Sequence, residues 1–159
     1  MSEIGALVIA DLHGEQLDGF LTRGTIAVLK VSDLDLIDDG IICDRSEAST
    51  RKALEHFADK KIEWLVLSKA ERGALMSVNR SIYQSRPPKL EVVDEIGAGD
   101  SMTAALVVAR LQGLGPEAAL RLACAAGTAN VTRHGLASAP AELIRELADE
   151  IAVELVGSQ

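Results

Sequence analysis

Aromatic residues are scarce in this 159-residue chain, where they make up only 3% of the sequence. With so few rings, the protein has no stacking platform of the kind that binds single-stranded nucleic acid. Lysine and arginine are outnumbered by aspartate and glutamate, which gives a formal net charge of −8 at pH 7. That charge opposes binding to a phosphodiester backbone, and we therefore expect no nucleic-acid partner.

Cysteine and long apolar runs are also rare. The two cysteines, Cys43 and Cys124, lie far apart and form no Cys-x-x-Cys motif. This usage predicts a reduced, cytoplasmic protein without a structural disulfide. No apolar run is long enough to cross a bilayer, and acidic residues precede any long apolar stretch at the N-terminus. We therefore expect neither a membrane-spanning segment nor a signal peptide.

Apolar runs and helical stretches alternate along the chain, whose hydrophobic content of 48% is typical of a globular protein. The length fits a single domain over residues 1–159. Strands are predicted at residues 4–12, 25–31 and 62–68, a hairpin at residues 73–85, and a further strand ending near residue 93. Helices are predicted at residues 15–24, 46–61, 100–112, 116–133 and 141–156. The alternation predicts an α/β fold, with a mainly parallel sheet flanked by helices on both faces.

The motif Gly-Ala-Gly-Asp, from Gly97 to Asp100, joins an apolar run to an alanine-rich helix. Glycines at a helix start let the backbone turn sharply, and the free N–H groups of the first turn then point at one spot. Such donors stabilise the charge on a transferring phosphoryl group, and an ionised Asp100 beside them could accept a proton from an attacking hydroxyl. Taken alone, the short motif favours a simpler alternative, a tight turn with Asp100 as an ordinary helix cap.

Five segments, ordered along nearly the whole chain, decide between these alternatives. The turn and its helix read DEIGAGDSMTAALVVARLQGL, and the next helix reads EAALRLACAAGTANVTRHGL. Upstream lie ADLHGEQL, AVLKVSDLDL and VLSKAERGALM. Together they resemble the ribokinase or PfkB family of sugar kinases, including its segments Asp-x-x-Gly-Glu-x-Leu, Lys-Pro-Asn-x-x-Glu-Leu and Ser-Leu-Gly-x-x-Gly-Ala-Leu. The residues at positions 100–102 are most similar to the phosphofructokinase and tagatose-6-phosphate kinase branch.

The resemblance implies a ribokinase-like fold and phosphoryl transfer from ATP, with Mg²⁺, to a hydroxyl of a sugar or sugar phosphate. Gly97, Ala98 and Gly99 would form the anion hole for that group, and Asp100 would be the base that activates the hydroxyl. Asp94 matches an acid that, in several members, helps to hold a monovalent cation such as K⁺. The resemblance also places the following residues in the segments around the nucleotide: Ser68, Gly73, Cys124, Gly127 and Thr128.

The chain departs from the family pattern at several of these positions. Asp35 keeps a carboxylate where the family has a glutamate near the magnesium and phosphates, and Ser32 replaces the asparagine of the same segment. Ala70 stands where the first glycine of the nucleotide loop is expected. Glu95 places a negative charge just before the turn, where it would weaken anion binding unless its side chain points outward.

The matched segments correspond to the C-terminal half of the family's chain only. The resemblance assigns the sugar-binding residues and the β-lid to the other half. We therefore expect the chain to associate with itself or with a complementary chain, because it should expose surfaces that the other half would cover. The alternative is a non-catalytic relative that binds a nucleotide weakly or acts only through a partner chain.

Overall fold

The protein is described by a computed structural model, over residues 7–22, 24–136 and 138–158. Its strands form one sheet in which the spatial order, β1-β2-β3-β4-β5-β6, is also the order along the chain. The strands are β1 (Ile9–Asp11), β2 (Ile26–Ser32), β3 (Ile62–Ser68), β4 (Ala74–Val78), β5 (Ser81–Arg86) and β6 (Ala152–Ser158). Residues 4–6 of the first predicted strand lie outside the described residues.

The strand directions divide the sheet into two parts. Strands β1, β2 and β3 pair in parallel, and Asp11 lies directly opposite Lys30 in the register of β1 and β2. The pairings β3–β4, β4–β5 and β5–β6 are antiparallel. Strands β1, β2, β3 and β5 therefore point one way, and the carboxyl ends of β1, β2 and β3 meet at one edge of the sheet. The predicted α/β class is confirmed.

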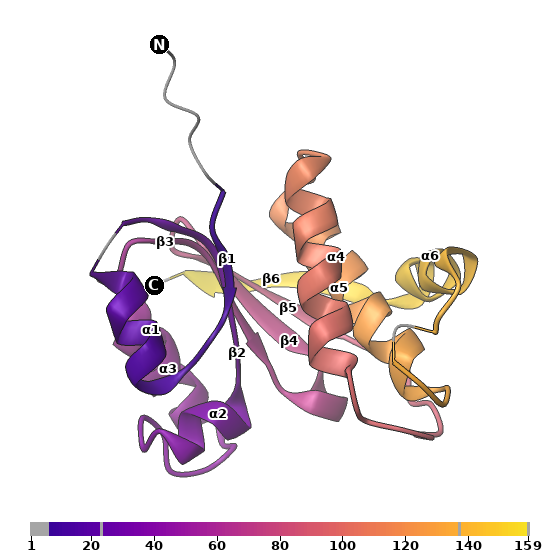
Figure 1. Ribbon diagram of the computed structural model, residues 1–159, viewed down its shortest axis with the longest axis horizontal. Helices are drawn as coiled ribbons and strands as arrows, with labels where there is room; N and C mark the ends of the chain where they lie inside the picture. Colours follow the sequence, from indigo (N-terminus) through magenta and orange to yellow (C-terminus); the bar gives the residue numbers. More distant parts are fainter. Residues whose placement is uncertain (1–6, 23, 137, 159) are drawn as a thin grey trace.

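Helices cover both faces of this sheet, as predicted (Figure 1). One face carries α1 (Gly14–Leu21), α2 (Asp33–Asp38) and α3 (Glu47–Phe57), and the other carries α4 (Ala98–Leu111), α5 (Pro116–Val131) and α6 (Ala141–Glu150). A short 3₁₀ turn, η1 (Ala70–Arg72), follows β3. No helix in the described part of the chain is both long and apolar enough to span a membrane.

Alternating residues of the strands build one core on each face of the sheet. Val28 and Val66 are buried with Leu106 of α4, whereas Leu29 and Leu67 are buried with the side chains of α3. The same alternation turns Lys30 and Ser68 toward the α4–α5 face. A layer of helices therefore covers each face of the sheet, and the carboxyl ends of the parallel strands lie beside the beginning of α4.

The predicted helix over residues 141–156 is wrong in its second half. Helix α6 ends at Glu150, and Ile151 is buried with an extended backbone (φ −83°, ψ 115°). The following residues form β6, which pairs antiparallel with β5. The free edge of β5 offers backbone hydrogen bonds to a neighbouring strand, and the residues after Ile151 form that strand. Periodicity alone does not show whether an apolar run of this length forms a helix or a strand.

The strand predicted before the glycine turn is also wrong, because residues 87–97 form neither helix nor strand. Strand β5 already pairs with β4 on one side and β6 on the other, so no edge remains there for another strand. The backbone N–H groups of Val93 and Asp94 instead donate to the carbonyl of Val131, at 2.7 and 3.2 Å. This segment is therefore attached to the end of α5 and leads directly into the turn.

Candidate active site

The glycine turn begins α4. Gly97 caps the helix with a left-handed backbone (φ 81°, ψ 4°), a conformation that favours glycine. A side chain there would also collide with Leu136, whose Cδ2 lies 2.6 Å from the ideal Cβ position. Ala98 is the first helical residue, and Asp100 lies exposed in the first turn, as the sequence predicted. The first turn of a helix leaves backbone N–H groups without intrahelical acceptors, and here that of Ala98 donates to the Glu95 carbonyl at 3.4 Å.

A buried asparagine of α5 holds the segment around Gly97 in place. Asn130 is 1% exposed, and its Nδ2 donates a 2.7 Å hydrogen bond to the carbonyl of Ile96. Its Oδ1 accepts a 3.3 Å hydrogen bond from the hydroxyl of Ser101. The sequence reasoning missed this residue, although a single amide in a run of small residues was a signal that could have identified it.

A buried lysine lies against the turn from β2. Lys30 is 6% exposed, and its Nζ donates to both carboxylate oxygens of Asp11, at 3.1 and 3.0 Å. An added Cβ on Gly99 would lie 2.8 Å from that same Nζ. The hydroxyl of Thr103 completes the cluster by donating to Asp11 at 2.8 Å and to the Gly99 carbonyl at 3.1 Å. A cation and a carboxylate thus flank the glycine turn.

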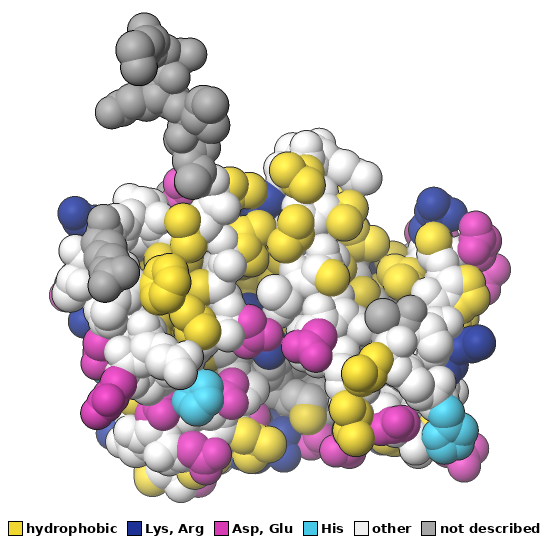
Figure 2. Space-filling model, viewed as in Figure 1, with side chains coloured by type: hydrophobic (Ala, Val, Ile, Leu, Met, Phe, Trp, Pro, Cys, Tyr) yellow, Lys and Arg dark blue, Asp and Glu magenta, His cyan; other side chains and the backbone are white. Residues whose placement is uncertain are grey.

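The sequence reasoning also missed Asp11 and Lys30, although both lie in segments that resemble the family. The available signals were a lysine inside the apolar run IAVLKV and an aspartate at the end of the first strand. Acidic and basic side chains lie together between the β1 side and α4 on the face that Figure 2 shows. The local charge next to the turn is therefore mixed, in contrast to the negative charge of the chain as a whole.

Asp35 occupies a helix cap. The Ser32 hydroxyl accepts from the N–H of Asp35 at 3.0 Å, and Asp35 Oδ2 accepts from the N–H of Ser32 at 2.9 Å. This reciprocal capping box begins α2 at the carboxyl end of β2. The replacement of two family residues by Ser32 and Asp35 therefore has a local structural explanation, because the shorter pair closes the cap.

The loop after β3 bends through two left-handed residues. Gly73 has φ 81°, and an added Cβ would lie 2.2 Å from the backbone oxygen of Ser85. Ala70 has φ 49°, which accounts for the glycine that the family pattern has at this position. Ser68 ends β3, and its hydroxyl donates to the Val31 carbonyl at 3.4 Å. This loop closes the same sheet edge at which Lys30 and the glycine turn lie.

The predicted nucleotide residues of α5 have different surroundings. Cys124 is buried, and burial raises the pKa of its thiol, so the side chain stays neutral and packs in the core. Gly127 permits close packing of α5 on α4, because an added Cβ would lie 3.2 Å from the Ala98 carbonyl. Thr128 is partly exposed on the same helix. Gly127 is thus brought to the turn, whereas Cys124 lies in the core.

Asp94, the residue predicted to help hold a monovalent cation, closes a small turn. Its Oδ1 accepts a 3.0 Å hydrogen bond from the N–H of Ile96, immediately before Gly97. Within the described residues, no three His, Cys, Asp or Glu side chains converge as a metal site would require. The structure therefore brings Asp94 next to the glycine turn, but in the described part of the chain it belongs to no cluster of three such side chains.

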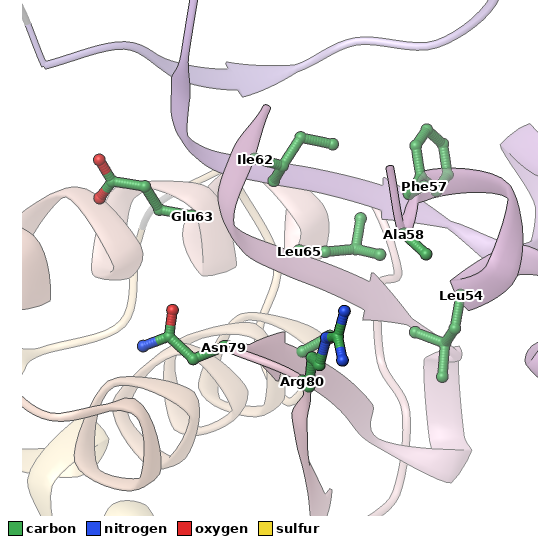
Figure 3. A pocket seen from close by; sticks show the side chains of 9 residues that line it. Leu54, Phe57, Ala58, Ile62, Glu63, Leu65, Asn79 and Arg80 are labelled. Carbon is green, nitrogen blue, oxygen red and sulfur yellow. The ribbon is translucent and has the colours of Figure 1, made fainter. Parts of the chain in front are cut away.

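A cavity of about 170 Å³ lies away from this region, on the α3 face, at the beginning of β3 (Figure 3). Apolar side chains of α3 and β3 and the turn between β4 and β5 line it: Leu54, Phe57, Ala58, Ile62, Leu65, Asn79 and Arg80. None of the predicted site residues contributes to it. The candidate active site is therefore separate from this cavity.

The sequence profile described as pfkB family carbohydrate kinase matches residues 27–142, which is more than half of the chain. The protein belongs to this family. As a pfkB family member, it is 31% identical over 103 residues to the 1-phosphofructokinase of Vibrio cholerae serotype O1, a match covering 65% of this chain and 32% of that relative. It is 28% identical over 132 residues to a tagatose-6-phosphate kinase of Staphylococcus epidermidis, covering 80% and 42%.

Solved structures show the same fold for this pfkB family chain. The phosphofructokinase-2 of Escherichia coli, in complex with potassium, superposes with a TM-score of 0.81 at 24% identity, over 91% of this chain and 47% of that chain. The ribokinase-like fold is thus confirmed. The chain spans less than half the length of these relatives, as the sequence segments indicated.

Proposed function

We propose that the chain is the anion-hole half of an ATP-dependent kinase that phosphorylates a hydroxyl of a sugar or sugar phosphate. The carrying observation is the position of the Lys30 ammonium against Gly99, at the start of the helix that presents Asp100. Family membership supports the reaction class, because the similar proteins of V. cholerae and S. epidermidis are named as sugar-phosphate kinases.

The chemistry follows from the charges around the turn. The N–H groups from Gly97 to Gly99, together with Lys30, would stabilise negative charge on the transferring phosphoryl group. Asp100, held in the first turn of α4 and open to solvent, would accept the proton of the attacking hydroxyl. In this proposal the Lys30 ion pair with Asp11 holds the ammonium in place before the nucleotide arrives.

The cofactors fit this arrangement to different degrees. Mg²⁺ binds through one or two protein carboxylates together with phosphate oxygens, and Asp11 is the carboxylate that contacts the lysine at the turn. K⁺ would lie near Asp94 and the turn that it closes, which the potassium complex of the E. coli relative supports. Ser68, Gly73 and Thr128 would lie along the nucleotide, at the edge left open between η1 and α5.

The test is ATP-dependent phosphorylation of fructose 6-phosphate, fructose 1-phosphate and tagatose 6-phosphate. It uses the full gene product, with the half that carries the sugar-binding residues, and compares the wild type with Asp100→Asn and with Asp149→Asn, an exposed aspartate of α6. General-base catalysis contributes about 10²–10⁴-fold, so kcat should fall by about that factor in Asp100→Asn and stay unchanged in Asp149→Asn. An unchanged rate in Asp100→Asn would overturn the assignment of the base.

A second candidate, a module that acts only through a partner chain, is supported by exposed apolar side chains. Leu111 is 75% exposed and Ile96 69% exposed, and hydrophobic side chains lie open over β1 and α4 (Figure 2). Such a surface favours association with a second copy or with a complementary chain. Light scattering would give the oligomeric state. Calorimetry with ATP and ADP would separate the two candidates, because a pure interaction module binds neither nucleotide.

A further inference from the structure

A second cavity, of about 350 Å³, lies on the face of the sheet opposite to the glycine turn. Its walls are the beginning of α3, the 3₁₀ turn η1 and the end of β5. Gln84 and Arg86 of β5 point into it, whereas Ser85 between them is fully buried on the α5 side, where its Oγ accepts from the N–H of Ala74. The sheet therefore separates this cavity from the face on which Lys30 lies.

The decisive residue of this cavity is Lys69. Its side chain lines the cavity and is only 8% exposed. No hydrogen bond or ion pair of its Nζ is found within the described ranges, and no fully buried side-chain nitrogen there lacks a hydrogen bond, so the Nζ atom reaches the cavity while most of the side chain is buried. Burial lowers the pKa of Lys69, and the neighbouring Arg72 lowers it further. The family pattern has leucine at this position, so the buried charge is a property of this chain.

The carboxylates nearest to Lys69 are committed elsewhere. Asp33 is buried and accepts from Arg45 Nε at 2.8 Å and from the guanidinium of Arg72 at 2.5 Å. Glu71 is exposed and lies 3.6 Å from Arg45. Glu47, in the first turn of α3, is exposed at the rim. Lys69 thus forms no ion pair with these carboxylates, although the charges of Asp33 and Glu47 partly offset the lowering of its pKa.

Further donors surround the same space. Arg72 and Arg86 contribute guanidinium groups, Thr50 a hydroxyl and Gln84 an amide. Arg86 is held only weakly, by a 4.0 Å contact with the exposed Glu154. Guanidinium, ammonium and hydroxyl groups are the donors that phosphate oxygens accept. A volume of about 350 Å³ falls at the small end of ligand pockets and suits a compact molecule rather than a nucleotide.

We propose that this cavity binds a small phosphate-bearing anion, with the Lys69 ammonium at its centre and Arg86 at its rim. The anion is either inorganic phosphate or a phosphate monoester of a small sugar, because both present the same oxygens. This site is distinct from the proposed site of phosphoryl transfer. The loop from Ser68 to Gly73 forms one wall of it, so an anion bound here contacts the segment that resembles the nucleotide loop of the family.

Calorimetric titration of the 159-residue protein with inorganic phosphate, and separately with fructose 6-phosphate, tests the proposal at constant ionic strength. Lys69→Met and Arg86→Gln should each weaken the binding of phosphate by about tenfold. The exposed-lysine variant Lys60→Met should leave it unchanged, and Lys30→Met should leave in place the part of the binding that depends on Lys69. Stronger binding of fructose 6-phosphate than of phosphate, lost in Lys69→Met, would identify the monoester as the ligand.

Two results would overturn the proposal. One is a loss of phosphate binding in Lys30→Met with none in Lys69→Met, which would place the anion at the glycine turn. The other is an equal loss in Lys60→Met, which would indicate binding by general surface charge. Arg86 is exposed, so Arg86→Gln tests the site without disturbing the core. Lys69→Met should melt at or above the wild-type temperature, because it removes a charge that the burial of the side chain disfavours.

Discussion

Asn130 Nδ2 donates to the carbonyl of Ile96 at 2.7 Å, and this single hydrogen bond joins the end of α5 to the residue before Gly97. The amide is fully buried and also accepts from Ser101, so it contacts the glycine turn on both sides. The orientation of the first N–H groups of α4 therefore depends on a residue that is remote from them in the sequence.

Asn130→Leu should destabilise the protein by about 1–3 kcal/mol, because the partly buried hydrogen bond from its Nδ2 to the Ile96 carbonyl is lost. Ser101→Ala removes only the longer 3.3 Å hydrogen bond and should cost less than about 1 kcal/mol. Urea unfolding followed by circular dichroism measures both. If Ser101→Ala proved the more damaging of the two, Asn130 would not be the group that holds the turn.

Gly99→Ala should displace the Lys30 ammonium, since the new Cβ would lie 2.8 Å from Nζ. If the proposed function is right, ATP affinity falls by about tenfold while the fold is kept, because the end of a lysine side chain can move. Gly19→Ala is the matched control: it lies in helix α1 with no atom within 4 Å of the new Cβ. It should stabilise the protein by about 0.5–1 kcal/mol and leave ATP binding unchanged.

Gly73→Ala and Ala70→Gly should have opposite effects on stability, although both change one methyl group in the same loop. The first requires a left-handed alanine whose Cβ would lie 2.2 Å from the Ser85 oxygen, so it should unfold the loop. Ala70→Gly removes the strain of a left-handed alanine in the folded state, which stabilises the protein by about 1–2 kcal/mol. It also raises the conformational entropy of the unfolded chain, which destabilises the protein by about 0.4–1 kcal/mol. A net gain of about 0–1.6 kcal/mol is expected in thermal melts. A clear loss in Ala70→Gly would contradict this assignment.

His13 should titrate above its usual value of 6.5, because its Nδ1 lies 3.0 Å from the Asp39 carboxylate, which raises its pKa. The folded-state pKa exceeds the unfolded one, so the ion pair contributes stability fully below pH 6.5 and loses it as pH rises through the raised value. The contribution is small, since the imidazole is 48% exposed. In NMR titrations, Asp39→Asn should lower this pKa, and the exposed Asp59→Asn should not; an unchanged value in Asp39→Asn would exclude the pairing.

The sequence predicted the elements whose signal is local. The run at residues 62–68 is mostly apolar, and it forms β3 with the predicted bounds. The glycine turn was also predictable, since Gly97 adopts a conformation that a side chain would oppose. Helix α6 and strand β6 could not be separated, because the apolar residues after Glu150 suit either structure. The free edge of β5 decided the outcome, and a local pattern contains no information about that edge.

The contacts of the candidate site depend on pairings between distant segments. Lys30 meets Asp11 because the two residues lie opposite each other in the parallel register of β1 and β2. A register shift of one residue would turn the lysine to the other face of the sheet. The family pattern placed Asp35 near the phosphates, but its use in a helix cap follows from Ser32, three residues away. Its predicted role toward the nucleotide stays a prediction.

The order of the strands has a consequence for how the protein acquires its structure during synthesis. Each strand from β1 to β5 pairs with the next one to leave the ribosome, so these pairings close short loops and can form early. Strand β6 alone must wait until α4, α5 and α6 have been made. The helices that carry Asp100 and Asn130 are therefore made after the first five strands of the sheet and before the last one. Their docking and the final strand pairing should form one late cooperative step.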